Sequence, residues 1–233
     1  EGATVLDAQT GAYYTPITAL DFESLYPSIM VAHNLCYSTM VMDPKYDNLP
    51  GVEYEQHGEY RFAQGVQSLL PEILAELKQF RKKAKADMKR AKGTSMEAVY
   101  NGQQLAYKAS MNSVYGFTGA TNGGMLPLVA IAASVTMQGR KMIEMTKNYV
   151  EKNFDGAKVR YGDTDSVMVE FDTGGRKGQE AIDYSWSQGE LAAEACTRLF
   201  KAPNNLELEK VYCPYFLYTK KSYAARANRL SDR

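Results

Sequence analysis

The sequence lacks a net charge, a disulfide pattern and any apolar run long enough to span a membrane. It has 27 basic and 27 acidic side chains, so any affinity for nucleic acid must come from local clusters rather than from an overall field. Its three cysteines, Cys36, Cys196 and Cys213, lie far apart without a CxxC pair, which favours buried free thiols over a disulfide framework or a cysteine zinc site. The first residues, "EGATVLDAQTG", lack the basic and apolar blocks of a signal peptide. We therefore expect a soluble, intracellular protein, and a piece of a longer chain, because no closing element follows "RANRLSDR".

Strand and helix patterns alternate along the 233 residues without an internal repeat. Helical spacing of apolar residues predicts a helix over 70–92 that stops at Gly93, and a second helix from Thr94 or Ser95 to Tyr115 with Gly116 as terminator. These two helices would form a hairpin inserted between β-containing parts. The other expected elements are, in chain order, β structure over 13–22, a helix over 24–35, short strands within 40–66, a helix within 125–150, a hairpin around 163, a helix over 189–200 and strands within 205–225.

Two aspartates lie at the tip of the hairpin predicted in "YGDTDSVMVEF". A tight turn through Thr164 would expose both Asp163 and Asp165. Carboxylates this close repel each other unless a cation lies between them, and hard oxygen ligands suit Mg²⁺ held together with substrate phosphates. The alternative is a solvated turn, since Gly, Asp, Thr and Ser all favour turns.

A second acidic position has an unusual context in "LDFESLYPSIM". Asp21 ends a predicted strand and the backbone then bends into a helix, so the amides of Phe22, Ser24 and Leu25 could point at a phosphate. Tyr26 would then project beside a bound sugar. For Tyr26 the alternative is an amphipathic core tyrosine.

The predicted helical hairpin is basic. Arg81, Lys85 and Lys89 are four residues apart and share one helical stripe, whereas Lys108, Asn112 and Tyr115 share a face of the next helix. A solvated surface explains most of the charge, namely that of Lys82, Lys83, Lys89, Arg90 and Lys92. Lys108 differs, because it lies within "LAYKASMNSVYGFTG", where a lone lysine would be desolvated unless an anion such as a triphosphate met it.

The segments "DFESLYPSIM", "KASMNSVYGFTG" and "YGDTDSV", in this order and spacing, resemble the three polymerase motifs of family B DNA polymerases. The flanking segments "EGATVLDAQTGAYY", "MVAHNLCYST" and "ELEKVYCPYFLYTKKSYAA" resemble its DNA polymerase delta group, cellular or from large DNA viruses. The resemblance implies an α+β fold: a palm with an antiparallel sheet and packed helices, plus an inserted two-helix antiparallel fingers hairpin. It places the palm at 1–66 and 124–233 and the fingers at 67–123.

The resemblance also implies residue roles. Asp21 and Asp165 would bind two Mg²⁺ ions, for which Mn²⁺ can substitute, with the Phe22 carbonyl as a further ligand and Asp163 as a less essential carboxylate. Tyr26 would be the steric gate against ribonucleotides, and Glu209 a weaker acidic neighbour of the metals. The nucleotide-binding set would be Ser24, Leu25, Tyr26, Arg81, Lys85, Lys108, Asn112, Tyr115 and Gly116, with Lys108 also in the catalytic set.

The segment "TKKSY" resembles the family's Lys-Lys-Arg-Tyr segment that contacts the DNA minor groove. Lys220, Lys221 and Tyr223 match it, whereas Ser222 stands where arginine is usual. The implied partners are primer-template DNA, dNTP, and a sliding clamp with accessory subunits, in a nucleus or a viral replication compartment and without a membrane. An exonuclease domain before this region and a thumb after it, which the family usually carries, are not visible.

Template-directed DNA synthesis by a two-metal mechanism is therefore the expected function. A catalytically inactive relative that binds DNA or partner subunits is the alternative, and the presence of Asp21, Asp163 and Asp165 argues against it. A polymerase that makes RNA or copies it is a third hypothesis, which depends on whether Tyr26 excludes a ribose 2′-hydroxyl.

Overall fold

A computed structural model describes residues 6–120 and 128–230. These residues form two compact units. One unit comprises Ser24–Gln138, and the other comprises the residues up to Glu23 together with those from Gly139 onward. The predicted boundary between 123 and 124 lies outside the described residues, and the palm and fingers division stays a prediction.

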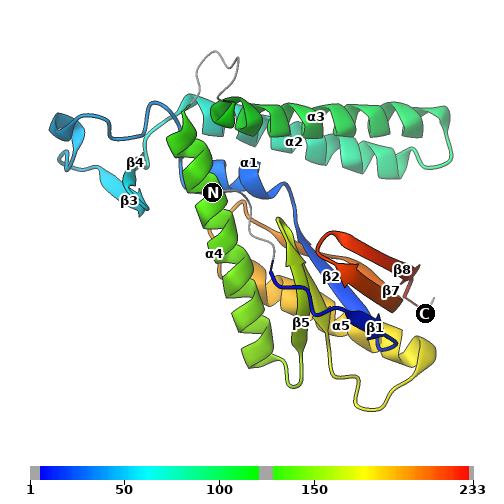
Figure 1. Ribbon diagram of the computed structural model, residues 1–233. Helices are drawn as coiled ribbons and strands as arrows, with labels where there is room; N and C mark the ends of the chain where they lie inside the picture. Colours follow the sequence, from blue (N-terminus) through cyan, green and yellow to red (C-terminus); the bar gives the residue numbers. More distant parts are fainter. Residues whose placement is uncertain (1–5, 121–127, 231–233) are drawn as a thin grey trace. The chain divides into compact units, whose positions relative to one another are not determined.

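The second unit is built on an antiparallel sheet whose strands follow the order β1-β7-β2-β6-β5, with β8 paired to β7 (Figure 1). A buried cluster lies on one face of the sheet and comprises Ile17, Ala19, Tyr161, Met168, Tyr212, Tyr215 and Leu217. The strands are β1 (Gly11–Tyr13), β2 (Ile17–Phe22), β5 (Lys158–Asp163), β6 (Ser166–Glu170), β7 (Leu206–Thr219) and β8 (Ser222–Asn228).

Helix α5 (Gly178–Thr197) packs against β2 and β7. The contact is close at Gly189, where an added Cβ would lie 2.4 Å from Leu208 Cδ1 and 2.7 Å from Thr18 Cγ2. The helix begins eleven residues before the predicted start at 189, because Ala181, Ile182 and Ser185 continue its buried face. Glycine is therefore required at 189 for the helix to approach the sheet.

The first unit contains helix α1, a small hairpin and a pair of long helices. Helices α2 and α3 run antiparallel and side by side (Figure 1), and α1 packs on both. The elements are α1 (Leu25–Ala32), the 3-10 turn η1 (Pro44–Tyr46), β3 (Glu53–His57), β4 (Tyr60–Gln64), α2 (Leu69–Arg90) and α3 (Ser95–Gly119). The predicted helical hairpin is confirmed, with Gly93 at φ 82° in the turn.

The prediction that Gly116 terminates α3 was wrong. The helix continues through Gly116 to Gly119, because Thr118 is fully buried and its hydroxyl donates to the Tyr115 carbonyl at 2.7 Å. Burial thus outweighs the roughly 1 kcal/mol by which glycine disfavours a helix. Helix α4 (Val129–Asn153) follows and belongs partly to each unit, since the division falls between Gln138 and Gly139.

The expected α+β class, with an antiparallel sheet, packed helices and an inserted helix pair, is confirmed. Within the described ranges, no helix combines the length and the hydrophobicity needed to cross a bilayer.

Candidate functional site

The predicted carboxylates Asp21 and Asp163 lie near the ends of β2 and β5, two strands of one sheet that flank β6. Asp21 is the penultimate residue of β2, Asp163 is the last residue of β5, and both have Ser166 of β6 as their register partner. Thr164 and Asp165 form the two-residue turn between β5 and β6. The predicted tight turn through Thr164 is therefore confirmed, and Asp165 is exposed at its tip.

The backbone ties the end of β2 to this turn. The Phe22 amide donates to the Asp165 carbonyl at 2.8 Å, which brings Asp21 and Asp165 to the same edge of the sheet. Asp21 and Asp163 instead flank Ser166 from opposite sides, so their Cα atoms are two strand spacings, roughly 10 Å, apart. Asp165 is thus better placed than Asp163 to share an ion with Asp21.

Asp163 already has a cationic neighbour. Its Oδ1 lies 3.0 Å from Lys221 Nζ and accepts a hydrogen bond from the Thr164 amide at 2.7 Å. Partial burial by itself raises the pKa of Asp163, but the Thr164 amide and the Lys221 ammonium outweigh burial and hold the pKa below its usual value. Asp163 is therefore ionised, and the Lys221 ammonium balances its charge without a metal.

The donor set at this edge suits Mg²⁺. Asp21 and Asp165 offer hard carboxylate oxygens on partly or fully exposed side chains, and Mg²⁺ needs only one or two carboxylates besides water and phosphate. Within residues 6–120 and 128–230, the three aspartates do not bring one oxygen each within 4.8 Å of one another. Asp21 and Asp165 are accordingly the residues that could hold the ion.

Sequence reasoning missed Glu207. Asp21 is in register with Glu207 of β7, and a β-bulge displaces Glu209 because Ala19 pairs with Lys210 while Leu20 pairs with Leu208. Glu209 is exposed and its Oε1 lies 3.1 Å from Lys210 Nζ. The alternation in "LELEK" gives both glutamates the same pattern, so only the register distinguishes them.

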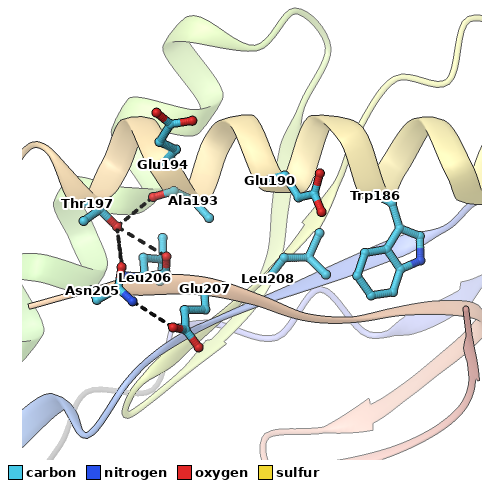
Figure 2. Close-up of a pocket in the computed structure, with 9 residues that line it drawn as sticks. All are labelled: Trp186, Glu190, Ala193, Glu194, Thr197, Asn205, Leu206, Glu207 and Leu208. Carbon is cyan, nitrogen blue, oxygen red and sulfur yellow. Dashed lines mark hydrogen bonds between the residues drawn. The ribbon is translucent and has the colours of Figure 1, made fainter. Parts of the chain in front are cut away.

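Glu207 also lines a pocket between α5 and β7 with a volume of about 420 Å³ (Figure 2). There, Asn205 Nδ2 donates to Glu207 Oε1 at 2.8 Å, and Thr197 Oγ1 accepts from the Leu206 amide at 2.9 Å. These bonds fix the start of β7 against α5. None of the residues predicted as functional lines this pocket.

The basic stripe of α2 divides into two groups. Arg81 and Lys85 are partly buried, whereas Lys82, Lys83 and Lys89 are exposed. Arg81 Nη1 donates to Ser24 Oγ at 2.9 Å, and its Nε donates to Gln104 Oε1 at 3.4 Å. Arg81 thus connects the start of α1 with α2 and α3.

The expected desolvation of Lys108 was wrong. Lys108 is exposed, as are Asn112, Ala109 and Ser110. The small residues around Lys108 therefore form an open helix surface and not a core. The Lys108 ammonium is hydrated when no anion is bound and is accessible to one.

Tyr26 and Tyr115, predicted separately to contact the nucleotide, form one aromatic pair. Their ring centroids are 4.6 Å apart with an interplanar angle of 45°. Burial raises the pKa of Tyr115, so its hydroxyl stays protonated.

Ser24 has a left-handed backbone with φ 49° at the start of α1, and the buried Leu25 follows it, which confirms a sharp bend after Asp21. Gly116 is exposed on α3.

The segment "TKKSY" forms the turn from β7 to β8. Lys220 Nζ lies 2.9 Å from Asp7 Oδ1, and Lys221 has φ 63° in the turn. The Tyr223 ring packs against the Tyr215 ring with centroids 5.1 Å apart and an interplanar angle of 31°. Ser222 is exposed and pairs with Thr219 across the turn.

Comparison with known proteins decides the family. The profile of the family described as DNA polymerase family B matches residues 1–233. The chain belongs to DNA polymerase family B.

Relatives within family B include a DNA polymerase of Paramecium bursaria Chlorella virus NY2A, which is 49% identical over 97% of this chain and 26% of its own length. The DNA polymerase delta catalytic subunits of Glycine max and Arabidopsis thaliana are 50% and 51% identical, each over 96% of this chain and 21% of their own length. The chain thus spans about a fifth to a quarter of the relatives that it matches. The resemblance inferred from the three motifs is confirmed.

Proposed function

We propose that this chain carries the nucleotidyl-transfer site of a template-directed DNA polymerase, which extends a primer 3′-hydroxyl with deoxynucleotides. One observation supports this above the others. The hydrogen bond from the Phe22 amide to the Asp165 carbonyl brings the carboxylates of β2 and of the β5–β6 turn to one sheet edge. Family membership supplies the reaction class. A viral DNA polymerase and a cellular DNA polymerase delta catalytic subunit are each about half identical to this chain.

In this proposal Asp21 and Asp165 hold the metal, with the Phe22 carbonyl as a further ligand. Two bound Mg²⁺ ions, or Mn²⁺ in their place, would supply the charge that lowers the pKa of the primer hydroxyl and stabilises the leaving pyrophosphate. Asp163 has a different part. Paired with Lys221, it fixes the turn that presents Asp165.

The nucleotide would be held by residues of the first unit. Arg81, Lys85, Lys108 and Asn112 would bind the triphosphate, with the amides of Ser24 and Leu25 as further donors. Tyr26 would lie under the deoxyribose and exclude a 2′-hydroxyl, and its contact with Tyr115 would keep the ring in place. Gly116 would leave room for the nascent base pair.

Lys220, Lys221 and Tyr223 would contact primer-template DNA from the β7–β8 turn. A sliding clamp and accessory subunits would join the whole protein, in a nucleus or a viral replication compartment, in keeping with its viral and cellular relatives. Glu207, in register with Asp21, would be an outer acidic neighbour of the metals, and Glu209 a weaker candidate for that role.

Calorimetric titration of dNTP, with and without Mg²⁺, tests the proposal on the parent protein and on Asp165→Asn. The control is Asp155→Asn, which removes an exposed aspartate from another turn of the same unit. We expect Mg²⁺-dependent binding that Asp165→Asn weakens and Asp155→Asn leaves intact. In primer extension by the whole protein, Asp165→Asn should lower the rate at least about 100-fold, since a catalytic metal supplies several kcal/mol.

Equal binding without Mg²⁺ and in Asp165→Asn would contradict the metal assignment. The basic helix pair alone would then hold the phosphates. In that case the alternative function, a non-catalytic family member that binds DNA or subunits, would be favoured. Circular dichroism of each variant excludes unfolding as the cause.

A further inference from the structure

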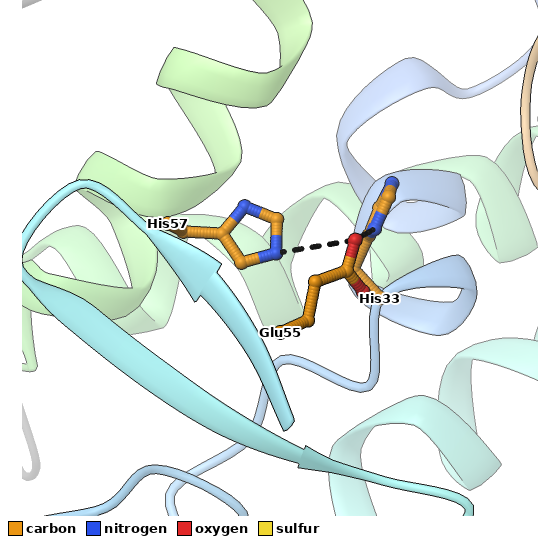
Figure 3. Close-up of side chains that lie close together, drawn as sticks. All are labelled: His33, Glu55 and His57. Carbon is orange, nitrogen blue, oxygen red and sulfur yellow. Dashed lines mark hydrogen bonds and ion pairs between the residues drawn. The ribbon is translucent and has the colours of Figure 1, made fainter. Parts of the chain in front are cut away.

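Both histidines of this chain lie in one cluster, in the unit that does not contain the polymerase motif aspartates. The chain has only 2 histidines in 233 residues, and His33 and His57 have ring centroids 5.2 Å apart. Both are buried, with 5% and 3% of their surface exposed. Glu55 lies beside them (Figure 3). Within the described part of the chain, these three residues alone bring His, Cys, Asp or Glu ligand atoms within 4.8 Å of one another as a group of three or more.

Local structure explains why these three side chains meet. Glu55 and His57 are two residues apart on β3 and therefore project from the same face of the strand. His33 is the C-terminal cap of α1, where its amide donates to the Ile29 carbonyl at 3.0 Å. Gln64 Nε2 of β4 donates to the His33 carbonyl at 2.8 Å, which holds the β3–β4 hairpin against this helix end.

The distances among the ligand atoms are those of a metal site. His33 Nδ1 lies 2.8 Å and His57 Nε2 lies 3.8 Å from Glu55 Oε1. All three ligand atoms lie within 4.8 Å of one another. In a tetrahedral zinc site with bonds of about 2.0–2.2 Å, neighbouring ligand atoms are roughly 3.3 Å apart, so the two separations from Glu55 Oε1 need to change by only about half an ångström.

The chemistry of the ligands selects the metal. Two imidazoles and one carboxylate suit Zn²⁺, whereas Mg²⁺ prefers oxygen ligands throughout. Glu55 would offset part of the ionic charge inside a largely apolar setting, where the Phe62 ring packs on His57 with centroids 6.0 Å apart. The Glu55 side chain keeps 26% of its surface exposed, which leaves a route for the ion and for a water as fourth ligand.

We propose that His33, Glu55 and His57 form a Zn²⁺ site that fastens the β3–β4 hairpin to the end of α1. This site shares no residue with the magnesium site proposed at Asp21 and Asp165. Its ligands come from segments 22 residues apart, so the ion closes a loop that otherwise depends on hydrogen bonds. Metal binding to the native state alone would stabilise that state by mass action.

The first test needs no substitution at the site. Metal-free protein carrying Asp21→Asn and Asp165→Asn, which removes the other proposed metal ligands, is titrated with Zn²⁺. We expect one equivalent to bind, to raise the melting midpoint, and to shift the ring nitrogen resonances of both His33 and His57. Zinc absorption spectroscopy should show two imidazole ligands. Absence of binding, or binding that leaves either ring unchanged, would overturn the proposal.

The second test compares matched variants. Glu55→Gln and Glu59→Gln make the same change on one hairpin, but only Glu55 is a proposed ligand, and Glu59 is exposed in the turn. We expect Glu55→Gln and His57→Gln to weaken Zn²⁺ binding at least about tenfold, and Glu59→Gln to leave it unchanged. Binding of parental strength in the folded Glu55→Gln and His57→Gln variants would equally overturn the site.

Discussion

Asp163 and Lys221 form an ion pair of 3.0 Å between the β5–β6 turn and the β7–β8 turn. The Lys221 amide also donates to the Tyr161 hydroxyl at 2.8 Å, so backbone and side chain of one residue hold both turns together. A residue proposed to contact DNA is thereby coupled to a carboxylate of the polymerase motif. Because of this coupling, a substitution of Lys221 should change the pKa of Asp163.

Lys221→Met should raise the pKa of Asp163, because the substitution removes the cation that stabilises the carboxylate. A group with a depressed pKa in the folded state adds stability above its unfolded pKa, about 3.9, and loses that contribution as the pH falls through the folded pKa. The stability difference between Lys221→Met and the parent should therefore be present at neutral pH and vanish in acid. Carboxyl NMR titration and denaturation at both pH values measure this.

Lys220→Met is the control. Lys220 lies on the same turn as Lys221, but it pairs with the fully exposed Asp7 and not with Asp163. It should leave the pKa of Asp163 unchanged. An equal shift in both variants would mean that the general field of the turn, and not the 3.0 Å contact, sets the pKa of Asp163.

Tyr26→Ala should relax discrimination against ribonucleotides by about tenfold or more, the range for steric exclusion of one small group. Tyr26→Phe keeps the ring that packs against Tyr115 and should keep the discrimination. Tyr107→Ala removes a tyrosine from another aromatic pair of the same unit, with Phe80 at 5.7 Å, and serves as control. The measurement is the ratio of kcat/KM for dNTP to that for rNTP; an unchanged ratio in Tyr26→Ala would exclude the gate role.

Arg81→Ala should raise the KM for dNTP and also lower the free energy of unfolding by about 1–2 kcal/mol, because it removes bonds to Ser24 and Gln104. Lys83→Ala, on the exposed side of the same helix, should change neither quantity. Single-nucleotide incorporation kinetics and urea denaturation separate the two effects. A KM effect of equal size in Lys83→Ala would indicate general attraction by the helix charge instead of a specific contact.

Gly189→Ala should destabilise the sheet unit by about 1–3 kcal/mol, because its Cβ would overlap Leu208 and Thr18. Gly102→Ala makes the same change in α3, where nothing lies within 4 Å of the added Cβ, and should stabilise by up to about 1 kcal/mol. Opposite signs in thermal or urea unfolding would verify the close approach of α5. A neutral Gly189→Ala would show that Leu208 moves aside at no cost.

Elements with strong local patterns could be predicted well from the sequence. The helix expected over 70–92 is α2 at Leu69–Arg90, and the hairpin around Asp163 forms as expected. Here apolar periodicity and turn residues act over a few neighbouring positions. The end of α3 was mispredicted, because burial of Thr118 is a long-range effect that a local glycine signal cannot reveal.

The sequence by itself determined the motif carboxylates, the basic helix pair and the family, because these depend on residue types at short fixed spacings. Only the tertiary structure decided which residues meet: Lys221 with Asp163, Glu207 instead of Glu209 opposite Asp21, and His33 with Glu55 and His57. The first joins two turns whose strands are not neighbours in the sheet. Strand register and the β-bulge set the second, and the packing of a hairpin on a helix end sets the third. These arise from contacts between residues distant in sequence, which leave no periodic trace in the chain.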